Sequence, residues 1–167
     1  MAGFHLAQFN IGRIRGPIDG PVMEGFVSQL AHINALAEAT PGFVWRLQTA
    51  EGDATALRPY DDPMMLVNMS VWESLEALHG YVYQSPHVGP LRERKSWFET
   101  PTEAILVLWW IPAGHIPTVE EAKERLAHLR QHGPTAHAFT FRHAFPAPGD
   151  ATIDAPDVDA EFCARPA

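Results

Sequence analysis

Met65-Leu66-Val67-Asn68-Met69-Ser70-Val71-Trp72-Glu73-Ser74 is the stretch that decides the fold of this chain. It has the pattern of a β-strand that carries polar groups on one face of an otherwise apolar run. Because side chains alternate along a strand, one face carries an amide, a hydroxyl and an indole, from Asn68, Ser70 and Trp72. Buried polar groups need partners. These three side chains therefore either satisfy one another or line a pocket, and the sequence leaves both interpretations open.

The segments on either side of this strand alternate between extended and helical patterns. Further strands are predicted at Phe4–Ile11, Phe43–Gln48 and Ile105–Ile111, and a possible last strand at Phe139–Phe145. Helices are predicted around Phe26–Ala37, after Ser74, in a short piece with Val88, Leu91 and Phe98 inward, and after the capping box Thr118–Glu121. This order predicts an α+β fold, a ferredoxin-like βαββαβ unit with an appended C-terminal helix and strand.

The predicted sheet has two faces, and the helices of the βαββαβ unit cover only one of them. A single chain does not obviously supply a cover for the other face. Pairing two sheets face to face would solve this, so a homodimer is expected.

Composition predicts one domain and a tail. The chain has 167 residues and is 46% hydrophobic, which is enough for a real core. We expect residues 1–148 to form the domain and residues 149–167 to form an acidic tail rich in Pro, Ala and Asp, either extended or crossing onto a partner subunit.

Charge and sequence patterns exclude several classes of function. A net charge of −8 argues against nucleic acid and against anionic membranes as partners. The longest apolar run, Ala104–Pro112, is too short to span a membrane. The N-terminus lacks the pattern of a signal peptide, and the single Cys163 allows no internal disulfide. A cytoplasmic protein is the simplest expectation.

Several motifs resemble the dimeric α/β-barrel superfamily, which includes the antibiotic-biosynthesis monooxygenases. Val71-Trp72-Glu73-Ser74-Leu75-Glu76-Ala77-Leu78 and the later Ser85-Pro86-His87 carry this likeness. The whole stretch from Phe4 to about Pro148 resembles an uncharacterised bacterial family of unknown function within that superfamily. The segments that carry this closer resemblance are Phe43–Gln48, Asn68–Ser74, Arg94–Phe98 and Leu108–His115.

The resemblance implies a set of site residues. Cofactor-independent monooxygenases of the superfamily use an Asn, a Trp four residues on, a Tyr in the next helix and an Arg beyond it. Asn68, Trp72 and Arg92 match this spacing. The tyrosine would fall near Leu78, whereas the chain offers Tyr81 and Tyr83. Haem-degrading members have a histidine ligand on the second helix, where this chain has Leu91 and Arg92, so axial ligation is not expected there.

Each candidate residue has a functional and a structural interpretation. Asn68 could hold a carbonyl or enolate oxygen, or could bond Ser70 or the backbone. Trp72 could stack on a flat ligand or close the end of the barrel. His79, Tyr83 and His87 could line a pocket mouth and move protons, or lie partly exposed on a helix.

Two arginines and two tryptophans complete the candidate set. Arg46 and Arg92 could counter a ligand's negative charge, or form surface ion pairs. Trp109 and Trp110 must lie on opposite faces of their strand, so one of them should face the interior. His128 and His132 stand at zinc-binding spacing, but no convergent third ligand is evident, so no metal is expected.

The resemblance and the candidate residues together imply a small-molecule enzyme of secondary metabolism, similar to the cofactor-independent monooxygenases and expected to need no cofactor. It would act on a flat, largely apolar substrate by oxygenation or by a proton-transfer rearrangement or cyclisation. The catalytic candidates are Asn68, His79, Tyr83, His87 and Arg92. The substrate-binding candidates are Arg46, Ser70, Trp72, Trp109 and Trp110. A non-catalytic ligand-binding or interaction module is the alternative, and a haem-binding protein is the third possibility.

Overall fold

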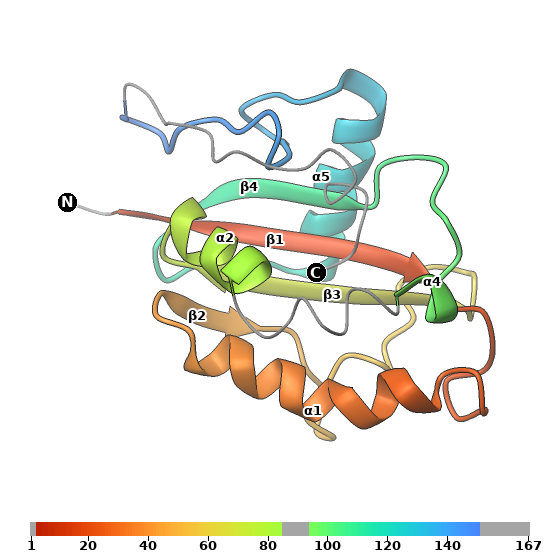
Figure 1. Cartoon of the computed structure of the whole chain (residues 1–167). Helices are drawn as coiled ribbons and strands as arrows, with labels where there is room; N and C mark the ends of the chain where they lie inside the picture. Colours follow the sequence, from red (N-terminus) through yellow and green to blue (C-terminus); the bar gives the residue numbers. More distant parts are fainter. Residues whose placement is uncertain (1–2, 85–93, 151–167) are drawn as a thin grey trace.

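A computed structural model describes residues 3–84 and 94–150, and in it four strands form one antiparallel sheet in the order β2-β3-β1-β4 (Figure 1). The strands are β1 (Phe4–Arg13), β2 (Phe43–Arg46), β3 (Met65–Trp72) and β4 (Leu106–Pro112). The helices are α1 (Glu24–Ala39), α2 (Leu75–Gln84), α4 (Arg94–Trp97) and α5 (Val119–His132). This order and pairing confirm the predicted ferredoxin-like fold, with α5 appended.

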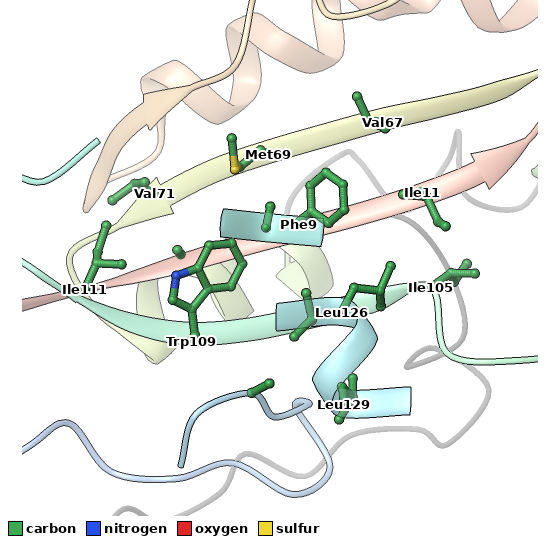
Figure 2. Close-up of a cluster of buried hydrophobic side chains, with 14 residues drawn as sticks. Phe9, Ile11, Val67, Met69, Val71, Ile105, Trp109, Ile111, Leu126 and Leu129 are labelled. Atoms are coloured by element: carbon green, nitrogen blue, oxygen red, sulfur yellow. The ribbon is translucent and has the colours of Figure 1, made fainter. Parts of the chain in front are cut away.

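The alternation predicted for β3 is present in the sheet. Val67, Met69 and Val71 point to one face, where they join a core cluster with Phe9 and Trp109 (Figure 2). The opposite face of the sheet carries the polar residues of β3. The two faces therefore differ in character, one apolar and the other partly polar.

The apolar face is covered by the chain itself, which corrects the expectation that one chain could not supply a cover. Helix α5 lies across this face, with Leu126 and Leu129 directed at the sheet (Figure 2). The Thr118 hydroxyl caps the helix by accepting a hydrogen bond from the Glu121 N–H, as predicted. Phe9 at the centre of this face has no exposed surface. A homodimer thus remains a prediction, but this face is not left open for it.

The connection between β2 and β3 completes that cover. Leu57 and Tyr60 from this connection pack against the same cluster. Lys123 on α5 joins the two parts, because its ammonium group donates to the Pro59 carbonyl at 2.7 Å and lies 4.7 Å from the centroid of the Tyr60 ring.

The other face of the sheet is covered by α1, α2 and α4 (Figure 1). Helix α1 is supported mainly near its two ends. Near its start, the Phe26 ring packs on Trp97 and Phe98, at centroid distances of 5.7 and 5.3 Å. Near its end, Ala37 is the one buried residue of the helix. The middle of α1 lies over a cavity.

The predicted strand at Phe139–Phe145 is wrong. Phe139 forms a single bridge with Leu108 on β4, through backbone hydrogen bonds of 2.8 and 2.9 Å. The chain then turns at once, because the Thr140 hydroxyl accepts from the His143 N–H. Strand pairing therefore stops after one residue, although Phe139 and Phe141 are both buried.

The short second helix is present as α4, and Phe98 after it is buried as expected. Val88, Leu91 and residues 151–167 of the expected tail lie outside the described residues. Among the helices of the described ranges, none is both long and apolar enough to cross a membrane.

Candidate functional site

A cavity of about 120 Å³ lies between the polar face of the sheet and the covering helices. Its walls come from β1, β2, β3, α1, α2 and α4, and from the connection after β2. Apolar side chains of α1 form much of one wall, among them Phe26, Leu30 and Ile33. The polar groups face them from the sheet. A mostly apolar cavity with a few convergent polar groups is the usual form of a small-molecule site.

Two pairs of polar residues stand opposite each other on β1 and β3. Gln8 pairs with Ser70, and Asn10 pairs with Asn68. All four side chains line the cavity. Asn68 and Ser70 were predicted from sequence, whereas Gln8 and Asn10 were missed. Their signal is the same alternation, because Gln8 and Asn10 flank the apolar Phe9 within β1.

Three hydrogen bonds link these residues into a chain with a fixed direction. The Trp72 indole N–H donates to Ser70 Oγ at 2.9 Å, the Ser70 hydroxyl donates to Gln8 Oε1 at 2.8 Å, and Gln8 Nε2 donates to Asn10 Oδ1 at 2.6 Å. An indole can only donate, so the hydroxyl must pass its own hydrogen on to Gln8. The chain therefore ends at Asn10 with its amide oxygen occupied and its NH₂ group still able to donate.

Asn68 lines the cavity without a hydrogen bond to its side chain from any residue that the structure describes. The expected structural partner was Ser70. That hydroxyl is already engaged, since it accepts from Trp72 and donates to Gln8. Asn68 is only partly buried, and it stands next to the end of the chain at Asn10. The two amides together offer N–H donors to a ligand oxygen.

Trp72 and Tyr81 form the wall near α2. Their rings stack at a centroid distance of 5.2 Å and an interplanar angle of 25°. The Tyr81 hydroxyl donates to the Ile33 carbonyl at 3.3 Å. Burial raises the pKa of Tyr81 above its ordinary value, and the charge of Arg46 opposes this only in part. Tyr81 is therefore a neutral donor at physiological pH. The resemblance placed a tyrosine near Leu78, and both Leu78 and Tyr81 line the cavity.

Two guanidinium groups line the cavity. Arg46 on β2 was predicted, and its Nε donates to Glu38 at 2.7 Å. Arg94 on α4 was missed; its side chain is buried and lies 5.3 Å from the centroid of the Phe98 ring. A buried guanidinium keeps its charge, and the charge of Arg46 is balanced by its ion pair with Glu38.

One carboxylate also lines the cavity and was missed by the sequence analysis. Asp53 lies in the polar connection after β2 and holds a tight turn, because its Oδ1 accepts from the Thr55 N–H at 2.8 Å and from the Thr55 hydroxyl at 2.6 Å. An aspartate that stabilises a turn is common in loops. Nothing in the local sequence distinguishes this turn residue from one that faces a cavity.

Several predicted residues lie elsewhere. His79 and Tyr83 stack on each other at a centroid distance of 4.4 Å and meet the edge of Phe141, away from the cavity walls. His87 and Arg92 lie outside the described residues.

Trp109 and Trp110 point to opposite faces, as predicted, but neither lines the cavity. The Trp109 indole donates to Glu121 at 2.9 Å, on the α5 side of the sheet. The Trp110 indole donates to the Phe145 carbonyl at 2.8 Å, and its ring packs on Phe139.

His128 and His132 of α5 form a cluster of rings with His137. The ring of His128 lies 4.5 Å from that of His132 and 4.6 Å from that of His137, measured between centroids. His137 also bonds Glu124 at 2.9 Å. Within the described ranges, no group of three or more His, Cys, Asp or Glu side chains has an arrangement that could hold a metal ion.

Comparison with solved structures finds distant similarity to monooxygenases. A variant of SnoaB, a cofactor-independent oxygenase from Streptomyces nogalater, matches 67% of this chain and 95% of its own, at 18% identity and a TM-score of 0.44. A putative antibiotic biosynthesis monooxygenase from Nitrosomonas europaea matches 70% of this chain and 93% of its own, at 13% identity and a TM-score of 0.42. The monooxygenase ActVA-Orf6 of Streptomyces coelicolor, in complex with nanaomycin D, matches 70% of this chain and 94% of its own, at 20% identity and a TM-score of 0.36.

Comparison with curated proteins gives no match. A family model described as a domain of unknown function, DUF3291, matches residues 5–155. The chain therefore belongs to the DUF3291 family, an uncharacterised family as the resemblance predicted.

Proposed function

We propose that this protein is an enzyme that binds a flat, largely apolar carbonyl compound and promotes loss of a proton from the carbon next to the carbonyl. The product of that step is an enolate. Either oxygenation or a rearrangement or cyclisation can proceed from an enolate, so this step is common to both reaction types expected from the sequence.

The observation that carries the proposal is the Asn68 amide, which lines the cavity without a protein hydrogen bond within the described residues. Its neighbour Asn10 accepts from Gln8 and so keeps its own NH₂ group as a donor. Donors that are fixed before the ligand arrives stabilise an oxyanion without reorganisation, and removing one such donor typically lowers the rate about 10²- to 10³-fold.

Charged groups lie in the same wall. Arg46, Arg94 and Asp53 are the charged residues among the described lining residues, and the Arg46 guanidinium is paired with Glu38. Trp72 and Phe43 supply apolar walls, with ring centroids 5.4 Å apart and planes at 83°.

Proton exchange on a model ketone tests this proposal without knowledge of the natural substrate. β-Tetralone is a nearly flat bicyclic ketone, and loss of its α-protons in deuterium oxide is followed by NMR. We expect the protein to accelerate this exchange. The variant Asn68→Ala should lower the acceleration about 100-fold or more, with an unchanged unfolding midpoint.

A matched control removes an amide far from the cavity. Gln131 lies exposed on α5, so Gln131→Ala should exchange β-tetralone as the wild type does. Full activity of Asn68→Ala would contradict the proposed role. So would a large loss of stability in that variant, since it would assign Asn68 to the core.

A binding module without catalysis is the competing function. The hydrogen-bond chain from Trp72 to Asn10 favours this binding module, because these polar side chains bond one another and so need no substrate as a partner. Such a module would bind lawsone, a flat hydroxynaphthoquinone whose colour reports its environment, but would not accelerate exchange. Titration with haemin tests the third function, and a Soret shift on binding would support it.

A further inference from the structure

The proposed function requires a group that accepts the proton, and few side chains of the cavity can do so. The ionisable residues among the described lining residues are Arg46, Asp53, Tyr81 and Arg94. An arginine does not lose its proton at physiological pH, so it cannot accept another. The Tyr81 hydroxyl holds its proton and donates it to the Ile33 carbonyl.

We infer that Asp53 is the proton acceptor of this cavity, an assignment that rests on the proposed function. Asp53 Oδ1 is held by the N–H and the hydroxyl of Thr55. Asp53 Oδ2 has no hydrogen bond or ion pair with any described residue. One oxygen is thus anchored, and the other is available to a substrate.

The backbone around Asp53 fixes this orientation. The Asp53 carbonyl accepts from the Thr49 N–H at 2.7 Å, and the preceding Gly52 adopts a positive φ of +92°. The next residue, Ala54, is buried and lines the same cavity. The turn therefore joins the cavity wall instead of extending freely from the surface, and the partly buried carboxylate keeps a defined position.

The proton transfer is balanced with groups already in the cavity. The Asp53 carboxylate takes a proton from the α-carbon, and the electron pair of that C–H bond becomes the carbon–carbon double bond of the enolate. The negative charge moves to oxygen, where Asn68 donates a hydrogen bond. The carboxylic acid then exchanges its proton with solvent and returns a deuteron to carbon in deuterium oxide.

The test is the pH dependence of β-tetralone exchange by Asp53→Asn. The amide oxygen of asparagine can still accept from Thr55, so the turn should persist. Wild-type exchange should rise with pH through one ionisation and then level off. We expect Asp53→Asn to lose about 100-fold or more of the exchange rate and to lose this ionisation, while it binds lawsone at least as tightly as the wild type.

Other titratable or charged groups belong to the same connection or line the same cavity. Glu51 and Arg58 belong to the connection, and Arg46 of β2, Tyr81 of α2 and Arg94 of α4 line the cavity.

A matched variant distinguishes Asp53 from the neighbouring carboxylate. Glu51→Gln removes an exposed carboxylate two residues away, and its exchange rate and pH profile should match the wild type. Loss of exchange in Glu51→Gln together with full exchange in Asp53→Asn would overturn the inference.

The result also separates this inference from the proposed function. If the wild type binds lawsone but does not accelerate exchange, the proposed function is wrong and the inference falls with it. If the wild type accelerates exchange and Asp53→Asn keeps both its rate and its pH profile, only the assignment of Asp53 is overturned.

Discussion

Ser70→Ala should destabilise this protein far more than the loss of one small hydroxyl suggests. The Ser70 hydroxyl accepts from the Trp72 indole at 2.9 Å and donates to Gln8 Oε1 at 2.8 Å. Trp72 has no exposed surface, Gln8 is 1% exposed and Ser70 is 7% exposed. Alanine removes both bonds and supplies no replacement, so a donor and an acceptor lose their partner in the interior.

The cost follows from those two groups. A buried polar group left without a partner costs about 1–3 kcal/mol, so the free energy of unfolding should fall by about 2–6 kcal/mol. At roughly 2–4 °C per kcal/mol for a chain of this size, the midpoint of thermal unfolding should fall by roughly 4 °C or more. Urea unfolding followed by far-ultraviolet circular dichroism measures the change in free energy.

Two comparisons make the result specific. Ser28→Ala removes a hydroxyl that bonds only the Gly25 carbonyl on exposed α1, and should change stability by less than about 0.5 kcal/mol. Adding Gln8→Leu to Ser70→Ala removes the stranded acceptor and should restore part of the loss. A change within about 0.5 kcal/mol for Ser70→Ala alone would refute the directed chain as a buried, mutually dependent unit.

Three further predictions concern other parts of the fold. Gly42→Ala should cost about 2 kcal/mol or more in urea unfolding, because φ is +89° there and a Cβ would lie 2.5 Å from that of Ala77; a stable variant would show that α2 shifts freely. Leu126→Ala on α5 should cost about 2–5 kcal/mol by the same measurement, because Leu126 is 1% exposed beneath the helix, and a change below about 1 kcal/mol would contradict the close cover. The pKa of Asp62 lies below its ordinary value, chiefly because its carboxylate accepts a hydrogen bond from the Met64 N–H. The ionised carboxylate therefore stabilises the fold above the unfolded pKa, and this contribution is lost as pH falls through the folded pKa. The free energy of unfolding of Asp62→Asn should be lower than that of the wild type at neutral pH, and this difference should disappear as pH falls below about 4; the same difference at neutral and at acidic pH would count against this.

The strands were largely predictable because each has a period that local sequence reveals. β3 follows the alternation of Met65–Trp72 closely, and its polar face does line the cavity. The segment after Phe139 shows where this reasoning fails. Its apolar residues are buried as a strand's would be, but the Thr140 turn removes the backbone from the sheet after one pair. A pattern of hydrophobic residues predicts which side chains are buried. It does not by itself show that their backbone pairs with a strand of the sheet.

The site was harder to predict, because it depends on which residues of distant segments meet. Tyr81 and Tyr83 are about 200° apart around a helix, so only one of them can face the cavity, and the sequence did not show which. Gln8 and Asn10 follow the alternation of a strand, but they can be assigned to the site only once β1 is known to pair with β3. Asp53 gives no local signal at all, because a turn aspartate looks the same whether it faces solvent or a cavity.

Helix α1 spans the cavity between two supports, and this has a thermodynamic consequence. Leu30 and Ile33 in its middle are only partly buried, and they face the cavity instead of packed core. The start of the helix also lacks a side-chain cap. A molecule that fills this space would pack against α1 as core residues would. Its binding would therefore raise the free energy of unfolding of the protein.

At a concentration 100 times its dissociation constant, such a ligand would add about 2.7 kcal/mol to the stability of the fold. Amide hydrogens in the middle of α1 would then exchange more slowly. A rise in the melting temperature can therefore identify ligands of this cavity in a screen of a compound library, before any reaction is known.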